Sequence, residues 1–446
     1  MIARRRRLLG LALVASLPAF AAAAIAATGS LTYSGCLANR GKQGCERPRD
    51  NALGNNVGIA VSPDGSQVYV VSVEGTLMRL SSTRPSQLTY EDCFADRGRH
   101  DCRDIPHDSI NSAAGVAVSP DGASIYVTSG QRTNAITRFK LGSTGQLRYR
   151  SCLANGGAHG GTGGCAKPPR NSLDSNEAMA MSPDGSSAYV VSSDSDSITR
   201  FARRAKGALV YRGCIANGGA RGCKRAKHGS LGGAFDVAVS PDGRSVYVAS
   251  MDGDSITRFN RDPTGALTYK GCFANGHAHG CRAPDHDSLG GAVALAVSPD
   301  GESVYVASLR AGAVTHFDRS TGGRLEFAGC IANWGSHGCR EPDQNSLNAA
   351  DGIAVSPDGA SVYATSMTGP TINGGPGAVT AFQRNPDGSL RPMGCFANEG
   401  KYECEQPGLP SLGSPESIAI SPDGGTVYVG SYGKTFSIFS REITLP

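Results

Sequence analysis

The tetrapeptide Ser-Pro-Asp-Gly occurs seven times in this chain, and successive copies begin 57, 63, 58, 58, 58 and 65 residues apart. A recurrence at this spacing is typical of a repeat architecture, in which each unit buries its apolar surface against its neighbours. The seven copies begin at Ser62, Ser119, Ser182, Ser240, Ser298, Ser356 and Ser421. Seven equivalent structural units are therefore expected.

One repeat, beginning at residue 235, contains four short segments with strand character. Residues 235–240 and 245–250 flank the Pro-Asp-Gly turn, and the second of them is rich in β-branched and aromatic residues. Residues 255–259 alternate apolar and polar side chains, and residues 266–271 follow another turn. Four antiparallel strands with tight turns form one propeller blade. We therefore predict an all-β fold, a seven-bladed β-propeller of four-stranded antiparallel blades.

The two ends of the chain complement each other. After the last Ser-Pro-Asp-Gly turn only two strand segments follow, at 426–431 and 435–440, so the last blade lacks its fourth strand. Residues 30–35 match the fourth-strand pattern and have no blade before them. We expect this N-terminal strand to pair into the last blade, which closes the ring and removes an exposed sheet edge.

Residues 1–27 have the composition of a secretion signal, with four arginines followed by a long apolar segment and small residues near Ala26. An uncleaved membrane anchor is the alternative. With this segment removed, residues 28–446 form one propeller domain with no membrane span. They carry 39 Lys and Arg against 38 Asp and Glu. This balance disfavours a nucleic-acid partner, and we expect a secreted, extracytoplasmic monomer.

The 14 cysteines occur two per repeat, and six of the seven pairs have a separation of nine residues. An even number of regularly spaced cysteines in an exported chain indicates disulfides, and zinc-knuckle spacing is absent. Local pairing predicts Cys36–Cys45, Cys93–Cys102, Cys152–Cys165, Cys214–Cys223, Cys272–Cys281, Cys330–Cys339 and Cys395–Cys404. We expect these loops to surround one mouth of the central channel, where they either rigidify long connections or build a binding rim.

The segment 239–250, followed by 254–259 and 265–269, resembles the YVTN-type and lactonase-like seven-bladed propellers, and the match recurs in every repeat. The resemblance implies the propeller fold. It also implies a phosphogluconolactonase-like or carboxymuconate-cyclase-like reaction, although the family includes secreted proteins without an assigned reaction. The expected inner strands, such as 58–61 and 115–118, carry neither His nor Arg.

Departures from the repeat pattern give the candidate site. Five positions before the turn serine, four repeats carry an apolar residue, whereas the other three carry Glu177, Asp351 and Glu416. Asp236 adds a carboxylate in the fourth repeat, and the only tryptophan, Trp334, lies in the cysteine loop before the sixth. An aromatic residue beside carboxylates suits a sugar, a cation or a polar metabolite. Solvated strand ends or ion pairs are the alternative explanation of these acids.

Three functions fit these observations. The first is a binding scaffold that holds a small molecule, a glycan or a protein at the loop rim. The second is a lactonase-like hydrolase or cyclase acting on a sugar-acid lactone or a muconate-type substrate, with the acids as general acid or base. The third is a structural envelope protein. No catalytic motif decides whether the protein is an enzyme, and neither a metal site nor a cofactor is expected because the histidines are spread around the ring.

Overall fold

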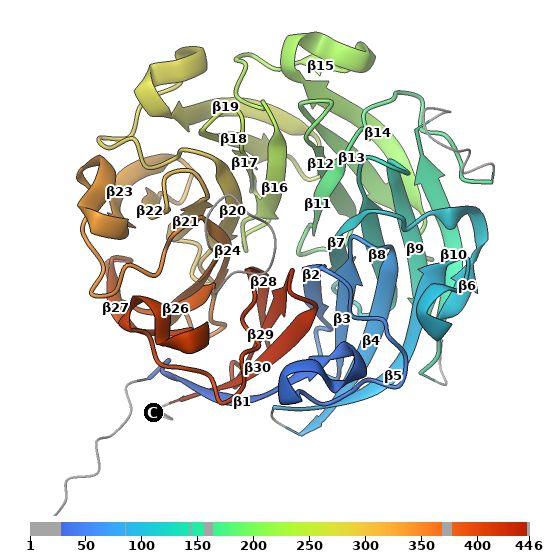
Figure 1. Ribbon diagram of the computed structural model, residues 1–446. Coiled ribbons are helices and arrows are strands. Elements are labelled where there is room, and N and C mark those ends of the chain that lie inside the picture. Colours follow the sequence, from blue (N-terminus) through green and yellow to red (C-terminus); the bar gives the residue numbers. More distant parts are fainter. Residues whose placement is uncertain (1–27, 85, 143–144, 156–163, 368–376, 444–446) are drawn as a thin grey trace, which may run out of the picture.

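The computed structural model describes residues 28–84, 86–142, 145–155, 164–367 and 377–443. Seven sheets are arranged around a central axis, and the strands of each sheet lie side by side in order from the axis outward (Figure 1). The fold is a seven-bladed β-propeller. The expected secretion signal lies outside the described residues, as does nearly all of the loop 367–377 in the sixth repeat.

The strands occupy four positions in each blade, counted from the axis. The inner strands are β2 (Asn56–Val61), β7 (Ala113–Val118), β11 (Asn176–Met181), β16 (Ala234–Val239), β20 (Ala292–Val297), β24 (Ala350–Val355) and β28 (Pro415–Ile420). The second strands are β3 (Gln67–Ser72), β8 (Ser124–Ser129), β12 (Ser187–Ser192), β17 (Ser245–Ser250), β21 (Ser303–Ser308), β25 (Ser361–Ser366) and β29 (Thr426–Ser431).

The third strands are β4 (Thr76–Arg84), β9 (Ala135–Leu141), β13 (Ser197–Arg203), β18 (Ser255–Arg261), β22 (Ala313–Arg319), β26 (Ala378–Arg384) and β30 (Thr435–Arg441). The outer strands are β5 (Gln87–Asp96), β10 (Leu147–Ala154), β14 (Leu209–Ala216), β19 (Leu267–Ala274), β23 (Leu325–Ala332) and β27 (Leu390–Ala397), with β1 (Leu31–Ala38) in the seventh blade. Blades 1 to 7 begin with β2, β7, β11, β16, β20, β24 and β28.

The first strand of the chain completes the seventh sheet. β1 pairs antiparallel with β30, from Leu31 opposite Arg441 to Ala38 opposite Thr435. The Tyr363 hydroxyl of blade 6 also donates a hydrogen bond to the Gly29 carbonyl, at 2.5 Å. Both ends of the described chain are therefore held within the ring.

The core lies between neighbouring blades. Every residue of the second strand β17 is buried, and Tyr247 packs with Val304 and Phe317 of the next blade. A strand covered on both faces is apolar at nearly every position, which explains why these segments are continuous Val, Tyr and Ala. Stability therefore depends on contacts between blades as well as within them.

The Ser-Pro-Asp-Gly segment is a tight turn closed by its own side chains. In blade 4, the Ser240 hydroxyl donates to Asp242 Oδ1 at 2.5 Å, and that oxygen also accepts the Arg244 amide at 3.0 Å. Gly243 has φ +67°, a conformation that glycine adopts without steric strain. The repeated tetrapeptide is thus required by turn geometry rather than by chemistry.

All seven predicted disulfides are formed, with Cα atoms 4.7–5.0 Å apart. Most of the loops between paired cysteines contain a short 3-10 helix. A further 3-10 helix follows the Cys93–Cys102 disulfide. These are η1 (Asn39–Gly44), η2 (Arg99–Asp101), η3 (Pro106–Asp108), η4 (Asn217–Gly222), η5 (Asn275–Gly280), η6 (Asn333–Gly338) and η7 (Asn398–Glu403).

The disulfide loops lie at the perimeter of the ring, which corrects the expectation that they surround the channel mouth. The residue after the second cysteine pairs with the outer strand of the same blade, as Arg282 does with Phe273. In two blades this contact is a short strand, β6 (Arg103–Ile105) or β15 (Lys224–Arg225). From there the chain runs toward the axis to the inner strand of the next blade, and Leu289, on one of these connections, is buried. Each disulfide therefore holds the chain against the outer strand of its own blade before the chain crosses to the next blade.

Candidate functional site

The predicted acidic positions coincide with a β-bulge at the start of the inner strands. The register between inner and second strands shifts there in all seven blades. In blades 3, 6 and 7 the bulge includes Glu177, Asp351 and Glu416. Bulges redirect a side chain relative to the regular pleat. These acids and Asp236 are half-buried, as expected for residues that line the central channel of a propeller.

Asp351 and Glu416 come from neighbouring inner strands that approach closely. A Cβ atom added at Gly352 would lie 2.5 Å from the Glu416 carbonyl oxygen, so only glycine allows this contact. The Thr365 hydroxyl links the two strands, because it accepts the Gly352 amide at 2.8 Å and lies 3.2 Å from the Glu416 carbonyl oxygen. The close approach of β24 and β28 therefore places these two residues side by side.

The carboxyl groups of Asp351 and Glu416 are here called the carboxyl pair. They form fewer hydrogen bonds than the other two acids of the channel. Neither forms a side-chain hydrogen bond or an ion pair with another described residue. Burial raises the pKa of Glu416, and the charge of Asp351 raises it further. Burial also raises the pKa of Asp351, with an added contribution from Asp236. At neutral pH the pair therefore holds at least one proton and can both donate and accept hydrogen bonds.

Asp236 belongs to the same electrostatic group but has a structural task. Its two carboxylate oxygens accept the amides of Val237 and Leu295, each at 2.8 Å, so it ties blade 4 to blade 5. Burial raises its pKa to about 6, although the two amide hydrogen bonds act in the opposite direction. Asp236 thus adds negative potential near the carboxyl pair while its own oxygens are occupied.

Glu177 is held apart from this group. Its Oε1 atom accepts hydrogen bonds from the hydroxyls of Ser193 at 2.7 Å and Ser175 at 3.0 Å. Burial raises its pKa, and these two hydroxyls oppose that shift. The charge of Asp194, in its own blade, raises this pKa further. Glu177 therefore fits a structural acid of blade 3.

Trp334 does not join the acids of the channel. It lies in η6, which packs on the outer strand β23 at the perimeter of blade 5 (Figure 1). Its side chain is 67% exposed, and its amide donates to Asn345 Oδ1 at 2.6 Å. Trp334 therefore lies at the perimeter, whereas the carboxyl pair lies in the channel. The three residues do not form the single site that the sequence predicted.

Within the described part of the chain, no group of three or more His, Cys, Asp or Glu residues is placed to hold a metal ion. No helix in the same residues is long and apolar enough to cross a membrane.

The chain shares its fold with candidate 6-phosphogluconolactonases. The structure of one such protein, from Bacteroides uniformis, is 18% identical with a TM-score of 0.54, covering 86% of this chain and 91% of that one. Another, from Bacteroides fragilis, is 18% identical with the same TM-score, covering 87% and 90%. A Lactobacillus plantarum protein is 17% identical with a TM-score of 0.54, covering 80% and 86%.

No family model matches the chain, and no curated protein matches it either. At these identities the structural similarity establishes the propeller fold and leaves the reaction open. The seven intramolecular disulfides add that the chain is suited to an extracytoplasmic environment, because disulfides persist where the surroundings are oxidising.

Proposed function

We propose that this protein is a secreted binding propeller that holds a small polyhydroxylated ligand at the carboxyl pair in its channel. The observation that carries the proposal is the contrast among the four acids. The oxygens of Asp236 are occupied by amides, and Glu177 is held by two hydroxyls, whereas Asp351 and Glu416 have no partner among the described residues. Unsatisfied polar groups on a channel wall are available to a ligand.

The protonation of the pair favours a sugar or another polyol. A carboxyl group that keeps its proton donates a hydrogen bond, and its ionised neighbour accepts one. Adjacent hydroxyls of a sugar offer the complementary acceptor and donor. A phosphorylated ligand fits less well, because Asp236 and Asp351 place negative potential at the site.

A thermal-shift titration of the oxidised protein with neutral sugars, sugar-acid lactones, muconates and amines tests this proposal. We expect stabilisation by neutral polyols that is lost in the Asp351→Asn, Glu416→Gln double variant. The matched control is Glu341→Gln, Asp343→Asn, which changes the same residue types at exposed positions of the adjoining cysteine loop. Stabilisation that survives the channel variant would show that the ligand binds elsewhere.

A lactonase-like reaction is the second candidate, supported by the similarity to candidate 6-phosphogluconolactonases and by the raised pKa values. Ionised Asp351 would take a proton from water as the water oxygen attacks the lactone carbonyl. Protonated Glu416 would give its proton to the ring oxygen as the carbon–oxygen bond breaks. The product is a hydroxy acid, and one proton has moved from Glu416 to the product and one from water to Asp351.

Turnover of an unphosphorylated sugar-acid lactone, measured by acid release, distinguishes this candidate from simple binding. If the protein is a lactonase, Asp351→Asn alone abolishes turnover, while the Glu341→Gln, Asp343→Asn control retains it. Binding without turnover in the unaltered protein would leave the scaffold function as the correct one.

A further inference from the structure

Two grooves with the same construction lie at the outer edge of neighbouring blades. The first, between blades 3 and 4, has a volume of about 370 Å³, and the second, between blades 4 and 5, about 510 Å³. Each is formed by the third and outer strands of one blade, the residues around its second cysteine, and the start of the outer strand of the next blade. The grooves therefore repeat with the blades.

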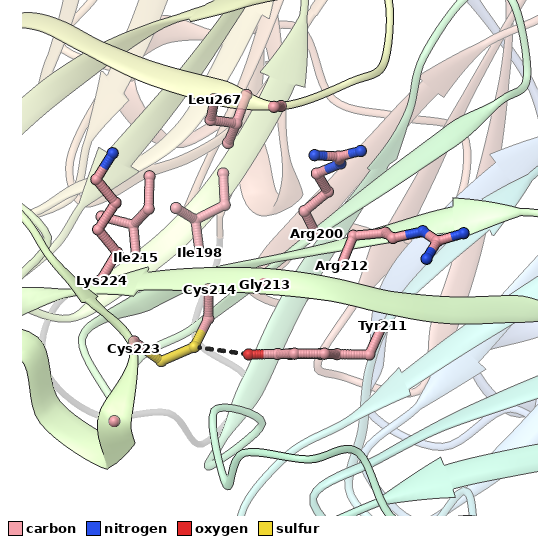
Figure 2. Close-up of a pocket in the computed structure, with 12 residues that line it drawn as sticks. Ile198, Arg200, Tyr211, Arg212, Gly213, Cys214, Ile215, Cys223, Lys224 and Leu267 are labelled. Atoms are coloured by element: carbon pink, nitrogen blue, oxygen red, sulfur yellow. Dashed lines mark hydrogen bonds between the residues drawn. A yellow bond between two sulfur atoms is a disulfide. The ribbon is translucent and has the colours of Figure 1, made fainter.

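Both grooves combine an apolar floor with cations. Figure 2 shows Arg200 and Arg212 on one side of Ile198 in the first groove, with Lys224 on the other side. In the second groove Arg258, Lys270 and Arg282 occupy the equivalent positions. Neither groove has an Asp or Glu among its lining residues.

One arginine in each groove is held in place by the following blade. Arg200 donates from Nη2 to the Thr264 carbonyl at 2.6 Å, and Arg258 donates to the Gly322 carbonyl at 2.5 Å. These contacts fix the two guanidinium groups without neutralising them, because a carbonyl carries no formal charge. Each groove thus presents one arginine positioned by the next blade, and in the second groove Arg282 also stacks over the Phe273 ring, 4.9 Å from its centroid.

The positive charge is local, although the chain after residue 27 is nearly neutral. Residues 197–235 contain nine Lys and Arg and no Asp or Glu. Arg203 pairs with Asp121 and Arg221 pairs with Asp174. The other seven form no ion pair with any residue that the structure describes. The outer edge of blade 3 and the two grooves beside it therefore carry an excess of positive charge.

We propose that this edge binds a linear acidic polysaccharide, laid across the two grooves. Tandem grooves one blade apart fit a polymer with regularly repeated carboxylates better than a single small anion. The apolar floor, with half-buried Ile215 and Leu267 in the first groove, offers a surface on which the C–H faces of sugar rings can pack. The seven disulfides suit a compartment where such glycans occur. This site is independent of the carboxyl pair in the channel.

Polygalacturonate, a carboxylated linear glycan, is the probe, and neutral dextran is its uncharged counterpart. We expect the full oxidised chain to bind polygalacturonate but not dextran in isothermal titration calorimetry. The Arg212→Gln, Lys224→Gln, Lys270→Gln, Arg282→Gln variant should weaken binding at least tenfold. All four positions are exposed, so the fold should be unaffected.

The matched control is Arg40→Gln, Lys42→Gln, Arg47→Gln, Lys401→Gln, which removes the same charges at exposed positions of blades 6 and 7. We expect its affinity to stay within twofold of the unaltered protein. Equal weakening by the two variants would overturn the proposal, because it would indicate non-specific attraction. It would also be overturned if duplex DNA or anionic vesicles bound at this edge while polygalacturonate did not.

Discussion

Arg319 donates from Nη2 to Asp242 Oδ2 at 2.7 Å, across the boundary between blades 5 and 4. The Arg319 side chain is only 4% exposed, and its Nε donates to the Tyr247 hydroxyl at 2.8 Å. Asp242 is the aspartate of the Ser-Pro-Asp-Gly turn. Although burial alone would raise the pKa of Asp242, hydrogen bonds from Ser240, the Arg244 amide and Arg319 lower it to about 2. The repeated turn therefore also anchors the neighbouring blade.

This Arg–Tyr–Asp contact, here called the blade clamp, recurs at five boundaries. The arginine, tyrosine and aspartate are Arg203, Tyr126 and Asp121; Arg261, Tyr189 and Asp184; Arg319, Tyr247 and Asp242; Arg384, Tyr305 and Asp300; and Arg441, Tyr363 and Asp358. Blade 2 has Leu141 at the arginine position, and the Tyr69 hydroxyl of blade 1 is buried with no partner among the described residues.

Replacing Arg319 with Gln should destabilise the protein, because Tyr247 and the turn aspartate lose a buried donor. The expected loss is about 2–3 kcal/mol, below the value for a fully buried pair because Asp242 is 34% exposed. Scanning calorimetry of the oxidised protein measures it. Arg324→Gln, which breaks an exposed pair with Glu326, is the control and should lower stability by less than about 1 kcal/mol. Equal effects of the two changes would refute a role for the clamp.

Leu141→Arg should stabilise the boundary between blades 1 and 2. The new guanidinium would reach the buried Tyr69 hydroxyl and the turn residue Asp64, as its counterparts do elsewhere. Since one buried hydroxyl gains a partner, the expected gain is about 1 kcal/mol, read as a rise in Tm. Lys140→Arg, one residue earlier and exposed, controls for adding a guanidinium and should have no effect. A lower Tm for Leu141→Arg alone would mean that the site cannot accommodate the clamp.

The carboxyl groups of the channel should make stability decrease as pH rises above about 4. Above the ordinary value of 3.8 the unfolded chain releases the Asp236 proton, whereas the folded protein keeps it until about pH 6. The raised pKa values of Asp351 and Glu416 act in the same direction. Unfolding therefore becomes easier through this range, and stability lost there does not return at higher pH.

The Asp351→Asn, Glu416→Gln variant should accordingly be more stable than the unaltered protein at pH 8, by about 1–3 kcal/mol. The difference should vanish near pH 4, where both carboxyl groups are protonated in the folded state. Thermal unfolding from pH 4 to pH 8 measures this, with Glu341→Gln, Asp343→Asn as the exposed control. A pH-independent difference would show that burial does not raise these pKa values.

Removing one perimeter disulfide, through Cys272→Ser with Cys281→Ser, should lower stability by about 2–3 kcal/mol in the chain-entropy account of a ten-residue loop. Removing Cys36–Cys45, which has the same separation of nine residues, should have a similar effect. The two losses should add, because the bonds lie in distant blades. Calorimetry checks both, and thiol titration of the denatured, unreduced chain should detect no free cysteine. Reactive thiols in that titration would contradict the seven disulfides.

Local sequence determined most of the fold. The Ser-Pro-Asp-Gly turn closes through its own serine and aspartate, and the paired cysteines are neighbours along the chain, so both features can be recognised without knowing the rest of the structure. The four strands of a blade are likewise adjacent in sequence. Short-range geometry therefore predicted the seven blades and all seven disulfides.

Contacts between residues far apart in the chain determine which acids of the candidate site are free. Asp236 and Asp351 both break the repeat pattern, yet one is satisfied by an amide 59 residues away and the other has no partner among the described residues. The same holds for Trp334, which lies near Asp351 in sequence but at the perimeter of the ring. Hydrogen bonding, burial and pKa depend on atoms that distant blades bring together, and no periodicity in the chain encodes those distances.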